Sequence, residues 1–266
     1  MKTRRRRVQA AGLLAAGLGT LLSLCDPTPV RAGWIVEEFD ADFPGESRTY
    51  LFQDSRVRAE GLLPGLIILL DLPAGEGYII DEKRGAYAGG RMGDIEAAFR
   101  AERRGGAAEA APEKSAAGKP GAPVVYPKMR LERSIGGEKV AGFASEHYRV
   151  LLDEEEDENL VEELWLAPAL GALKGEDVLS FLSGMRVMTG GSTWEMEDFP
   201  PGYDEHPDYL EILKSGFPVR RTRYFIGERS TVEVRAAAEK PLPESAFSVP
   251  SGLEKADYLE LFLGKR

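Results

Sequence analysis

Apolar and polar positions alternate along much of this chain, and the alternation predicts β-strands joined by short turns. Between residues 48 and 59 the alternation continues on both sides of an Asp54-Ser55 break, which predicts a hairpin with one buried face. Residues 66–70 are apolar without interruption, and a Pro-Ala-Gly-Glu-Gly turn precedes a second apolar run at residues 78–80. Such runs are typical of strands buried on both faces.

A short amphipathic helix and a loop are expected after these strands. Asp94 is expected to cap the helix. Its apolar face is formed by Ile95, Ala98 and Phe99. Residues 104–123 include no large apolar side chain, so they have nothing to bury. We expect this segment to be a flexible insertion within one sheet, because the strands before it do not complete a core of their own.

The second half of the chain repeats the strand pattern and then changes period. Apolar positions alternate in the expected strands, whereas they recur at every third or fourth residue in the expected helices. We expect strands at residues 129–131, 148–152, 160–166, 219–226 and 231–236, an acidic loop at residues 153–159, and helices around residues 178–185 and 209–213, the second stopping at Gly216. The elements predict a mainly β (α+β) fold, an antiparallel sheet with a helical excursion before its last hairpin.

The N-terminal segment, residues 1–32, has the three parts of a secretory signal peptide. A lysine and four arginines lie within residues 2–7, residues 10–24 are an apolar stretch, and a Val-Arg-Ala cleavage site ends at Ala32. The apolar stretch is shorter than the roughly 20 residues that cross a bilayer. We therefore expect a periplasmic or secreted protein whose mature part, residues 33–266, is a single domain.

Three other interpretations of this segment remain open. A Thr-Arg-Arg sequence from residue 3 opens a twin-arginine export signal, but the usual Phe and Leu do not follow it. A Leu-Ser pair begins the pattern that precedes a lipid-modified cysteine, here Cys25, but Leu24 stands where that pattern requires a small residue. A retained membrane anchor is opposed by two prolines, at positions 27 and 29, which close the apolar stretch.

Charge and cysteine content exclude some classes of function. The chain has 34 Lys and Arg and 44 Asp and Glu, of which residues 1–32 hold six and one. The mature part therefore carries a net charge of roughly −15, and it should repel nucleic acid and anionic lipid head groups. Because Cys25 is the only cysteine, the mature part can form no disulfide. Its stability must come from its core.

The chain offers little catalytic or metal-binding chemistry. His147 and His206 are its only histidines, and no cysteine joins them in a zinc site. Acidic residues at positions 153, 155 and 157 are spaced as in a calcium loop, but Glu158 stands where that loop needs glycine, so a solvated loop is the simpler interpretation. The sequence lacks phosphate-binding loops and the nucleophile elbow of hydrolases. We expect no catalytic residue, no metal and no cofactor, and we do not expect an enzyme.

Several turns and core positions resemble those of a secreted bacterial domain of unknown function, which is similar to the envelope proteins LolA, LolB and LppX. They are the Gly-Gly-Glu-Lys-Val-Ala-Gly-Phe run at residues 136–143, Tyr148, the strand that contains Trp165, and the Phe-Ser-Val-Pro-Ser-Gly run at residues 247–252. The resemblance covers about residues 34–253. It implies a strongly curved antiparallel sheet or incomplete barrel with covering helices, whose concave face holds acyl chains in the better-understood members. Such motifs specify a fold better than a function.

Two functions from different classes follow. In the first, a periplasmic or envelope protein binds or carries a lipid or another hydrophobic ligand in a half-barrel. In the second, a non-catalytic envelope structural or protein-interaction module has a barrel filled by its own side chains, and its acidic surface meets a basic or metal-decorated partner. A cavity of roughly 300–1,000 Å³ would distinguish the first from the second. The candidate ligand-binding residues are aromatic: Tyr148, Trp165, Trp194, Tyr224 and Phe225.

We expect the mature protein to begin at Gly33, because Val30 and Ala32 provide the small residues of a cleavage site. N-terminal sequencing of the exported protein measures this directly. An acylated Cys25 at the N-terminus would contradict both the cleavage site and the expectation of a soluble periplasmic protein.

Overall fold

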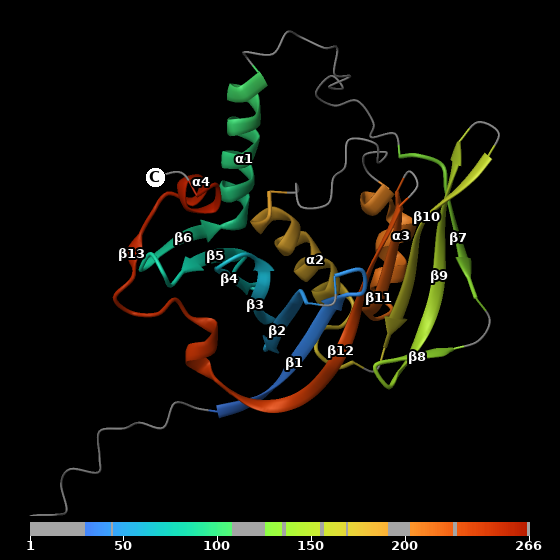
Figure 1. The fold of residues 1–266 in the computed structure, drawn as a ribbon, viewed down its shortest axis with the longest axis horizontal. Helices are drawn as coiled ribbons and strands as arrows, with labels where there is room; N and C mark the ends of the chain where they lie inside the picture. Colours follow the sequence, from blue (N-terminus) through green and yellow to red (C-terminus); the bar gives the residue numbers. More distant parts are fainter. Residues whose placement is uncertain are drawn as a thin grey trace, which may run out of the picture.

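The structure, a computed structural model, describes residues 30–43, 45–107, 126–134, 137–154, 157–168, 170–190, 203–225 and 228–264. It is mainly β, as the sequence predicts, and the helices lie beside one large sheet (Figure 1). The described helices are α1 (Met92–Ala107), α2 (Glu176–Met188), α3 (Pro207–Leu213) and α4 (Tyr258–Phe262), with short 3₁₀ turns η1 (Tyr203–Glu205) and η2 (Glu244–Phe247). None of these described helices is long and apolar enough to span a membrane.

The described strands form one open sheet. In chain order they are β1 (Val30–Asp40), β2 (Ser47–Gln53), β3 (Arg56–Leu63), β4 (Leu66–Asp71), β5 (Glu76–Asp81), β6 (Ala86–Arg91), β7 (Met129–Arg133), β8 (Glu138–Val140), β9 (Phe143–Glu154), β10 (Asp157–Ala167), β11 (Phe217–Phe225), β12 (Glu228–Pro243) and β13 (Glu254–Lys255). Their order is β13-β6-β5-β4-β3-β2-β1-β12-β11-β10-β9-β7, and β8 pairs with β9. The pairs are antiparallel except for β13 and β6, which are parallel.

The hairpins of the N-terminal half follow the predicted pattern. Asp54 and Ser55 turn the chain between β2 and β3 with φ angles of 50° and 58°, the left-handed conformation of a two-residue hairpin turn. The register pairs Tyr50 with Ala59 and Phe52 with Val57, so these four apolar side chains point to one face. All four are buried, which confirms the predicted hairpin with one buried face.

The pairing of β1 with β12 joins the two halves of the sheet. The register runs from Val30 opposite Pro243 to Asp40 opposite Val232, and β12 extends well beyond the predicted strand at residues 231–236. β1 begins three residues before the expected mature N-terminus, Gly33. Upstream of that point, Arg31 forms an ion pair with Asp54 at 2.9 Å, and its carbonyl oxygen accepts a hydrogen bond from Gln53 Nε2 at 3.0 Å.

Helix α2 packs against the sheet through an aromatic cluster. Phe181 lies edge-on to Tyr50 and to Phe52, with ring centroids 5.6 and 5.4 Å apart, and Phe217 of β11 contacts both Phe52 and Phe181. The predicted helical spacing is confirmed, since Val178, Phe181 and Met185 are buried on one face of α2. We call this group, with the buried residues of β1–β6 around it, the α2 cluster.

A second apolar cluster lies under α3. It contains Tyr209 and Leu213 of that helix together with Tyr148, Val150 and Leu152 of β9 and Val161, Leu164 and Leu166 of β10, and we call it the α3 cluster. Leu182 of α2 packs against both clusters. The helix predicted near residues 209–213 is therefore confirmed, and α2 and α3 contact each other.

Three boundary predictions were wrong. Helix α1 begins at Met92, whose amide donates to the Gly75 carbonyl oxygen, so Asp94 lies in the first turn and does not cap the helix. The helix also continues to Ala107, past the expected start of the insertion at residue 104, and only residues 108–123 of the predicted insertion lie outside the described residues. The predicted acidic loop at 153–159 is mostly strand, since β9 reaches Glu154 and β10 starts at Asp157, opposite it in the ladder.

Deleting the Phe181 ring should destabilise the fold strongly, because the ring is 4% exposed and contacts three other aromatic side chains. We expect Phe181→Ala to lower the free energy of unfolding by about 3–5 kcal/mol, the usual range for a buried phenylalanine. Urea denaturation measures the change. Phe43→Ala is the matched control, since Phe43 is 64% exposed, and equal losses for both variants would contradict the α2 cluster.

Candidate functional site

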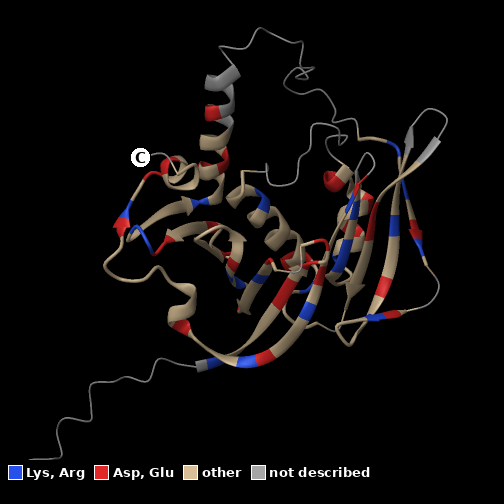
Figure 2. Cartoon of the chain, in the orientation of Figure 1, with Lys and Arg blue, Asp and Glu red and all other residues tan. Residues whose placement is uncertain are grey.

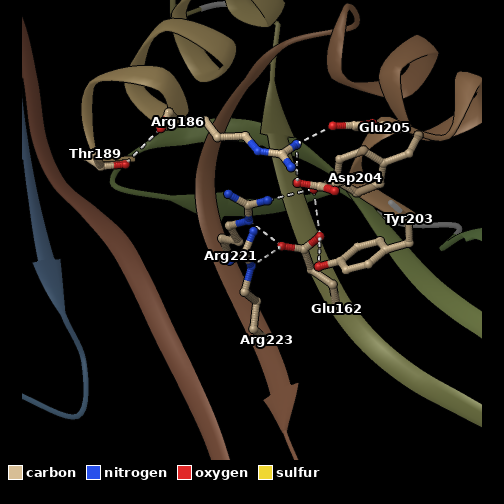
Figure 3. Close-up of polar contacts among 9 residues, drawn as sticks. Glu162, Arg186, Thr189, Tyr203, Asp204, Glu205, Arg221 and Arg223 are labelled. Carbon is tan, nitrogen blue, oxygen red and sulfur yellow. Dashed lines mark hydrogen bonds and ion pairs between the residues drawn. The ribbon is translucent and has the colours of Figure 1, made fainter. Parts of the chain in front are cut away.

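A buried carboxylate, Glu162 of β10, is the centre of a polar network that joins β10, β11 and α3. Its side chain is fully buried. One carboxylate oxygen accepts hydrogen bonds from Arg221 and, at 3.2 Å, from Arg223, and the other accepts from the Tyr209 hydroxyl at 2.7 Å. Tyr203 approaches the second oxygen at 3.4 Å (Figure 3). Each of the two carboxylate oxygens of Glu162 therefore accepts hydrogen bonds from two side chains.

The register of two neighbouring strands creates this network. Glu162 lies opposite Arg223, and Leu164 lies opposite Arg221, so both arginines project to the same face as Glu162. Helix α3 lies over that face and supplies Tyr209, whose hydroxyl also accepts a hydrogen bond from Arg221 Nη2 at 2.8 Å. The network therefore ties α3 to β10 and β11.

The arginines keep Glu162 ionised in an interior that disfavours charge. Burial alone would raise the pKa of its carboxyl, but Arg221 and Arg223 outweigh burial and hold the pKa below its ordinary value. Burial raises the pKa of the Tyr209 hydroxyl, so this group stays protonated and donates. A carboxylate that is ionised and fully paired has no proton to give and no free oxygen for a substrate, so the network serves to position α3.

Ion pairs extend the connection from α3 to α2. Arg186 in the last turn of α2 lies 2.8 Å from Glu205 and 3.4 Å from Asp204 of η1 (Figure 3). At the other end of the helix, Glu176 pairs with Lys214, which follows α3, at 2.9 Å. These exposed pairs connect α2 to η1 and to the end of α3, and each contributes little to stability.

A second carboxylate on the same side of the sheet behaves differently. Burial raises the pKa of Glu38 in β1 to about 6, although Arg48, Tyr50 and Arg221 oppose the shift. The positive charge of Arg221, which pairs with Glu162, therefore also acts on Glu38 through space. Polar side chains thus cross the sheet from β2 to β10 between the α2 cluster and the α3 cluster.

An open groove of about 400 Å³ lies between α1 and α2. Its walls are one face of each helix, at positions three or four residues apart. Gly184 brings these walls together, since a Cβ there would lie 3.1 Å from Leu70 Cδ1 and 3.3 Å from Met92 Sδ. The lining residues are Leu72, Met92, Gly93, Glu96, Leu179, Ser180, Ser183, Gly184 and Val187.

The C-terminal helix α4, which the sequence analysis missed, holds both walls of the groove. Phe99 of α1 lies edge-on to Tyr258 and to Phe262, with centroids 5.7 and 5.1 Å apart. The Tyr258 hydroxyl donates to the carbonyl oxygen of Met188, at the end of α2, at 2.6 Å. One side chain, Tyr258, therefore contacts both groove helices, and a five-residue helix after a proline- and glycine-containing segment gives too short a periodic signal to predict.

The described aromatic candidates do not converge on one cavity. Tyr148 lies opposite Leu164 and is buried in the α3 cluster, with its hydroxyl donating to Glu146 at 2.7 Å. Trp165 is one position further along β10 and points to the other face. Tyr224 donates to Glu163, which shares that face with Trp165. Trp194 lies outside the described residues, as does the side chain of Phe225, whose backbone ends β11.

Trp165 is held by contacts with its neighbours on three strands. Its ring stacks on His147 of β9 at 4.3 Å, and the Arg220 guanidinium of β11 lies 5.0 Å from its centroid. Because these neighbours come from the strands on either side, they enclose the ring between them. Its Nε1 donates to Glu138 at 2.9 Å, and the residue is 8% exposed. Trp165 is therefore buried by structural contacts on the face of β10 opposite Leu164.

Neither histidine lies in a group able to hold a metal, and no such group of three or more ligands occurs among the described residues. His147 stacks on Trp165, and its Nε2 lies 3.2 Å from Glu163. His206 caps α3, where its Nδ1 accepts a hydrogen bond from the Asp208 amide at 3.2 Å. Both side chains have structural contacts that the sequence did not indicate.

Comparison with known proteins adds no identity to these observations. No protein-family model matches the chain, and a search of curated proteins finds no significant match.

Replacing Glu162 with glutamine should leave Arg221 and Arg223 without a buried counter-charge. We expect Glu162→Gln to lower the free energy of unfolding by about 3–5 kcal/mol at neutral pH. The pKa of Glu162 is lower in the folded protein than in the unfolded chain. Its ionisation therefore stabilises the fold above the ordinary glutamate pKa, and this stability is lost as the pH falls through the folded pKa.

The difference between the wild type and Glu162→Gln should therefore shrink in acid. Urea denaturation at neutral pH and at about pH 3 measures it. Glu205→Gln is the control, because Glu205 is 54% exposed and forms a surface ion pair, for which about 0–1 kcal/mol is expected. A Glu162→Gln variant as stable as Glu205→Gln at neutral pH would rule out the anchoring role.

Proposed function

We propose that this protein binds an apolar ligand, such as a lipid, in the groove between α1 and α2. The observation that carries the proposal is the groove itself, an open space of about 400 Å³ with Leu72, Met92 and Leu179 among its lining residues. This volume lies within the range of small-molecule sites, roughly 300–1,000 Å³. It holds part of an acyl chain or one small apolar molecule.

The position of the ligand differs from the one that the aromatic residues suggested. Phe181 occupies the space between Tyr50, Phe52 and Phe217, where a ligand under α2 would otherwise lie. Displacing it would expose the α2 cluster to water at a cost of several kcal/mol. The groove, in contrast, accepts a ligand without moving α2, which Arg186 and Glu176 tie to its neighbours.

A carrier in the cell envelope is the role that best fits this site. The N-terminal segment has the pattern of a secretory signal peptide, and the chain resembles envelope half-barrel proteins. We infer that the open sheet is an incomplete barrel with α2 and α3 as its covering helices. Two contacts support this inference: Phe181 of α2 packs on Tyr50 of β2, and Tyr209 of α3 donates a hydrogen bond to Glu162 of β10. The network around Glu162 does not support an enzymatic function, because both oxygens of this carboxylate already accept hydrogen bonds from protein side chains.

The alternative is a non-catalytic envelope interaction module, and the packing of Phe181 favours it. A sheet covered in this way needs no ligand to complete its core. Acidic and basic residues are interspersed along the strands in Figure 2, which suits many weak polar contacts with a partner. The two functions differ in one measurable respect: only the first predicts a ligand whose affinity depends on the groove.

Filling the groove should block binding without unfolding the protein. Ser183 is exposed on the groove wall, so a phenylalanine there can enter the groove without a clash in the core. We expect Ser183→Phe to weaken binding of the neutral apolar dye N-phenyl-1-naphthylamine by about tenfold or more, the loss that 1.4 kcal/mol of binding energy produces. Fluorescence titration measures the affinity.

The control places the same substitution at an exposed position away from the groove, in a turn, Ser251→Phe, and this variant should bind the dye as the wild type does. Thermal melts establish that both variants fold. Native mass spectrometry of the purified wild type shows whether a lipid accompanies it. If wild type and Ser183→Phe bind the dye equally, the groove is not the ligand site and the interaction module is the better function.

A further inference from the structure

We infer that β7 pairs with β7 of a second copy of this chain, so that one continuous sheet runs through a dimer. β7 is the last strand at one end of the sheet order, where it pairs with β9. Within the part of the chain that the structure describes, no strand pairs with its other side, at the right-hand end of the sheet in Figure 1. Such an open edge offers backbone N–H and C=O groups to another strand.

The ladder between β7 and β9 shows which backbone groups of β7 face outward. The Ser134 amide donates to the carbonyl oxygen of His147 at 2.9 Å, and the register places these two residues opposite each other. In an antiparallel ladder, residues that bond the neighbouring strand alternate with residues whose N–H and C=O point away from it. Met129, Leu131 and Arg133 therefore direct their backbone groups to the open edge.

Two copies of this edge fit each other in one antiparallel register, which centres on Leu131. Outward-facing residues then lie opposite each other, Leu131 opposite its own counterpart and Met129 opposite Arg133 of the second copy. Each of these pairs exchanges two backbone hydrogen bonds. Because Leu131 packs against the α3 cluster, the apolar clusters of the two copies meet across the two-fold axis.

The charges on β7 favour this register and oppose the neighbouring ones. Arg130 and Glu132 lie on the face opposite Leu131, with side chains 47% and 39% exposed, and they form an ion pair at 3.1 Å within one copy. In the dimer, Arg130 of each copy also lies opposite Glu132 of the other, at pairs where cross-strand side chains approach closely. A slip by two residues, the smallest that keeps outward-facing groups together, would place two arginines or two glutamates opposite each other.

β7 lacks two features that commonly prevent edge strands from pairing. Residues 129–133 include no proline, and their register with β9 has no bulge. Because the edge is only five residues long, the dimer should be weak and reversible. The inference does not depend on the proposed function, since none of the residues that line the groove between α1 and α2 lies on β7.

A proline at the edge should block the dimer and leave the ladder with β9 intact. The Arg133 N–H faces outward, so Arg133→Pro removes a donor that only the second copy uses. We expect the dimer dissociation constant to rise about tenfold or more. Sedimentation velocity over a concentration series, in about 0.15 M salt to screen the net negative charge, measures it. Arg133→Ala is the matched control, because it removes the same side chain and its ion pair with Glu146 but keeps the amide.

Two charge reversals test the register itself. Arg130→Glu and Glu132→Arg each place like charges opposite each other at both cross-strand pairs, so each variant alone should dimerise about tenfold more weakly than the wild type. A mixture of the two variants restores opposite charges at both pairs. We therefore expect the mixture to form a heterodimer of nearly wild-type affinity, although neither variant dimerises well alone.

Each outcome decides the inference. A wild type that stays monomeric throughout the series would overturn it and leave the edge to a different partner. A wild-type dimer that Arg133→Pro and the charge reversals do not weaken would show that another surface makes the contact. Thermal melts establish that each variant folds, and if Arg133→Pro does not fold, the mixture of Arg130→Glu with Glu132→Arg still decides, because a heterodimer requires the register centred on Leu131.

Discussion

The antiparallel pairing of β1 with β12 is the constraint on which the rest of this structure depends. It joins residues about 200 positions apart in the chain, from Val30 opposite Pro243 to Asp40 opposite Val232. Without it, the sheet of β1–β6 and the sheet of β7–β12 would be separate, with β1 and β12 as exposed edges. Gly33 shows how close the strands come, because a Cβ there would lie 2.7 Å from the Phe52 carbonyl oxygen and clash with Leu242.

Once the sheet is continuous, α2 has a surface on which to pack. Phe181 then contacts rings from strands on both sides of the β1–β12 pair, Phe52 on β2 and Phe217 on β11. This placement fills the space that a ligand under α2 would need, so the open volume lies on the far side of the helix, next to α1. Tyr258 contacts both helices and fixes the separation of the groove walls.

The Glu162 network gives α3 a unique position at an energetic cost. A fully buried carboxylate is expensive to desolvate, and two arginines and a tyrosine are needed to offset the cost. Apolar side chains of similar volume would provide stability without that cost, but they would accept many orientations of α3. The hydrogen bonds that Glu162 accepts from Tyr209 and Arg221 are directional and restrict how α3 lies on β10 and β11, and the exposed pairs of Arg186 with η1 add a weak connection to α2.

The sequence by itself determined the local elements. The alternation around Asp54 and Ser55 predicted a hairpin, and the spacing of Val178, Phe181 and Met185 predicted the buried face of α2, because both patterns reflect interactions within a few residues. It could not predict β1 as a strand or the full length of β12, since their pairing is set by residues at opposite ends of the chain. Long-range pairing leaves no short-range signal.

Only the tertiary structure decided which side chains form the sites. Tyr148 and Trp165 looked equivalent as strand aromatics, yet the register of β9 and β10 sends them to opposite faces, where a helix covers one and a histidine and an arginine enclose the other. Nothing in the sequence distinguishes Glu162 from the other acidic residues. Only the packing of β11 and α3 places Arg221 and Tyr209 beside it. Likewise, Glu96 of α1 and Ser183 of α2 line the same groove only because the two helices lie side by side. Periodicity tells which residues share a face, but the packing of distant elements decides what that face meets.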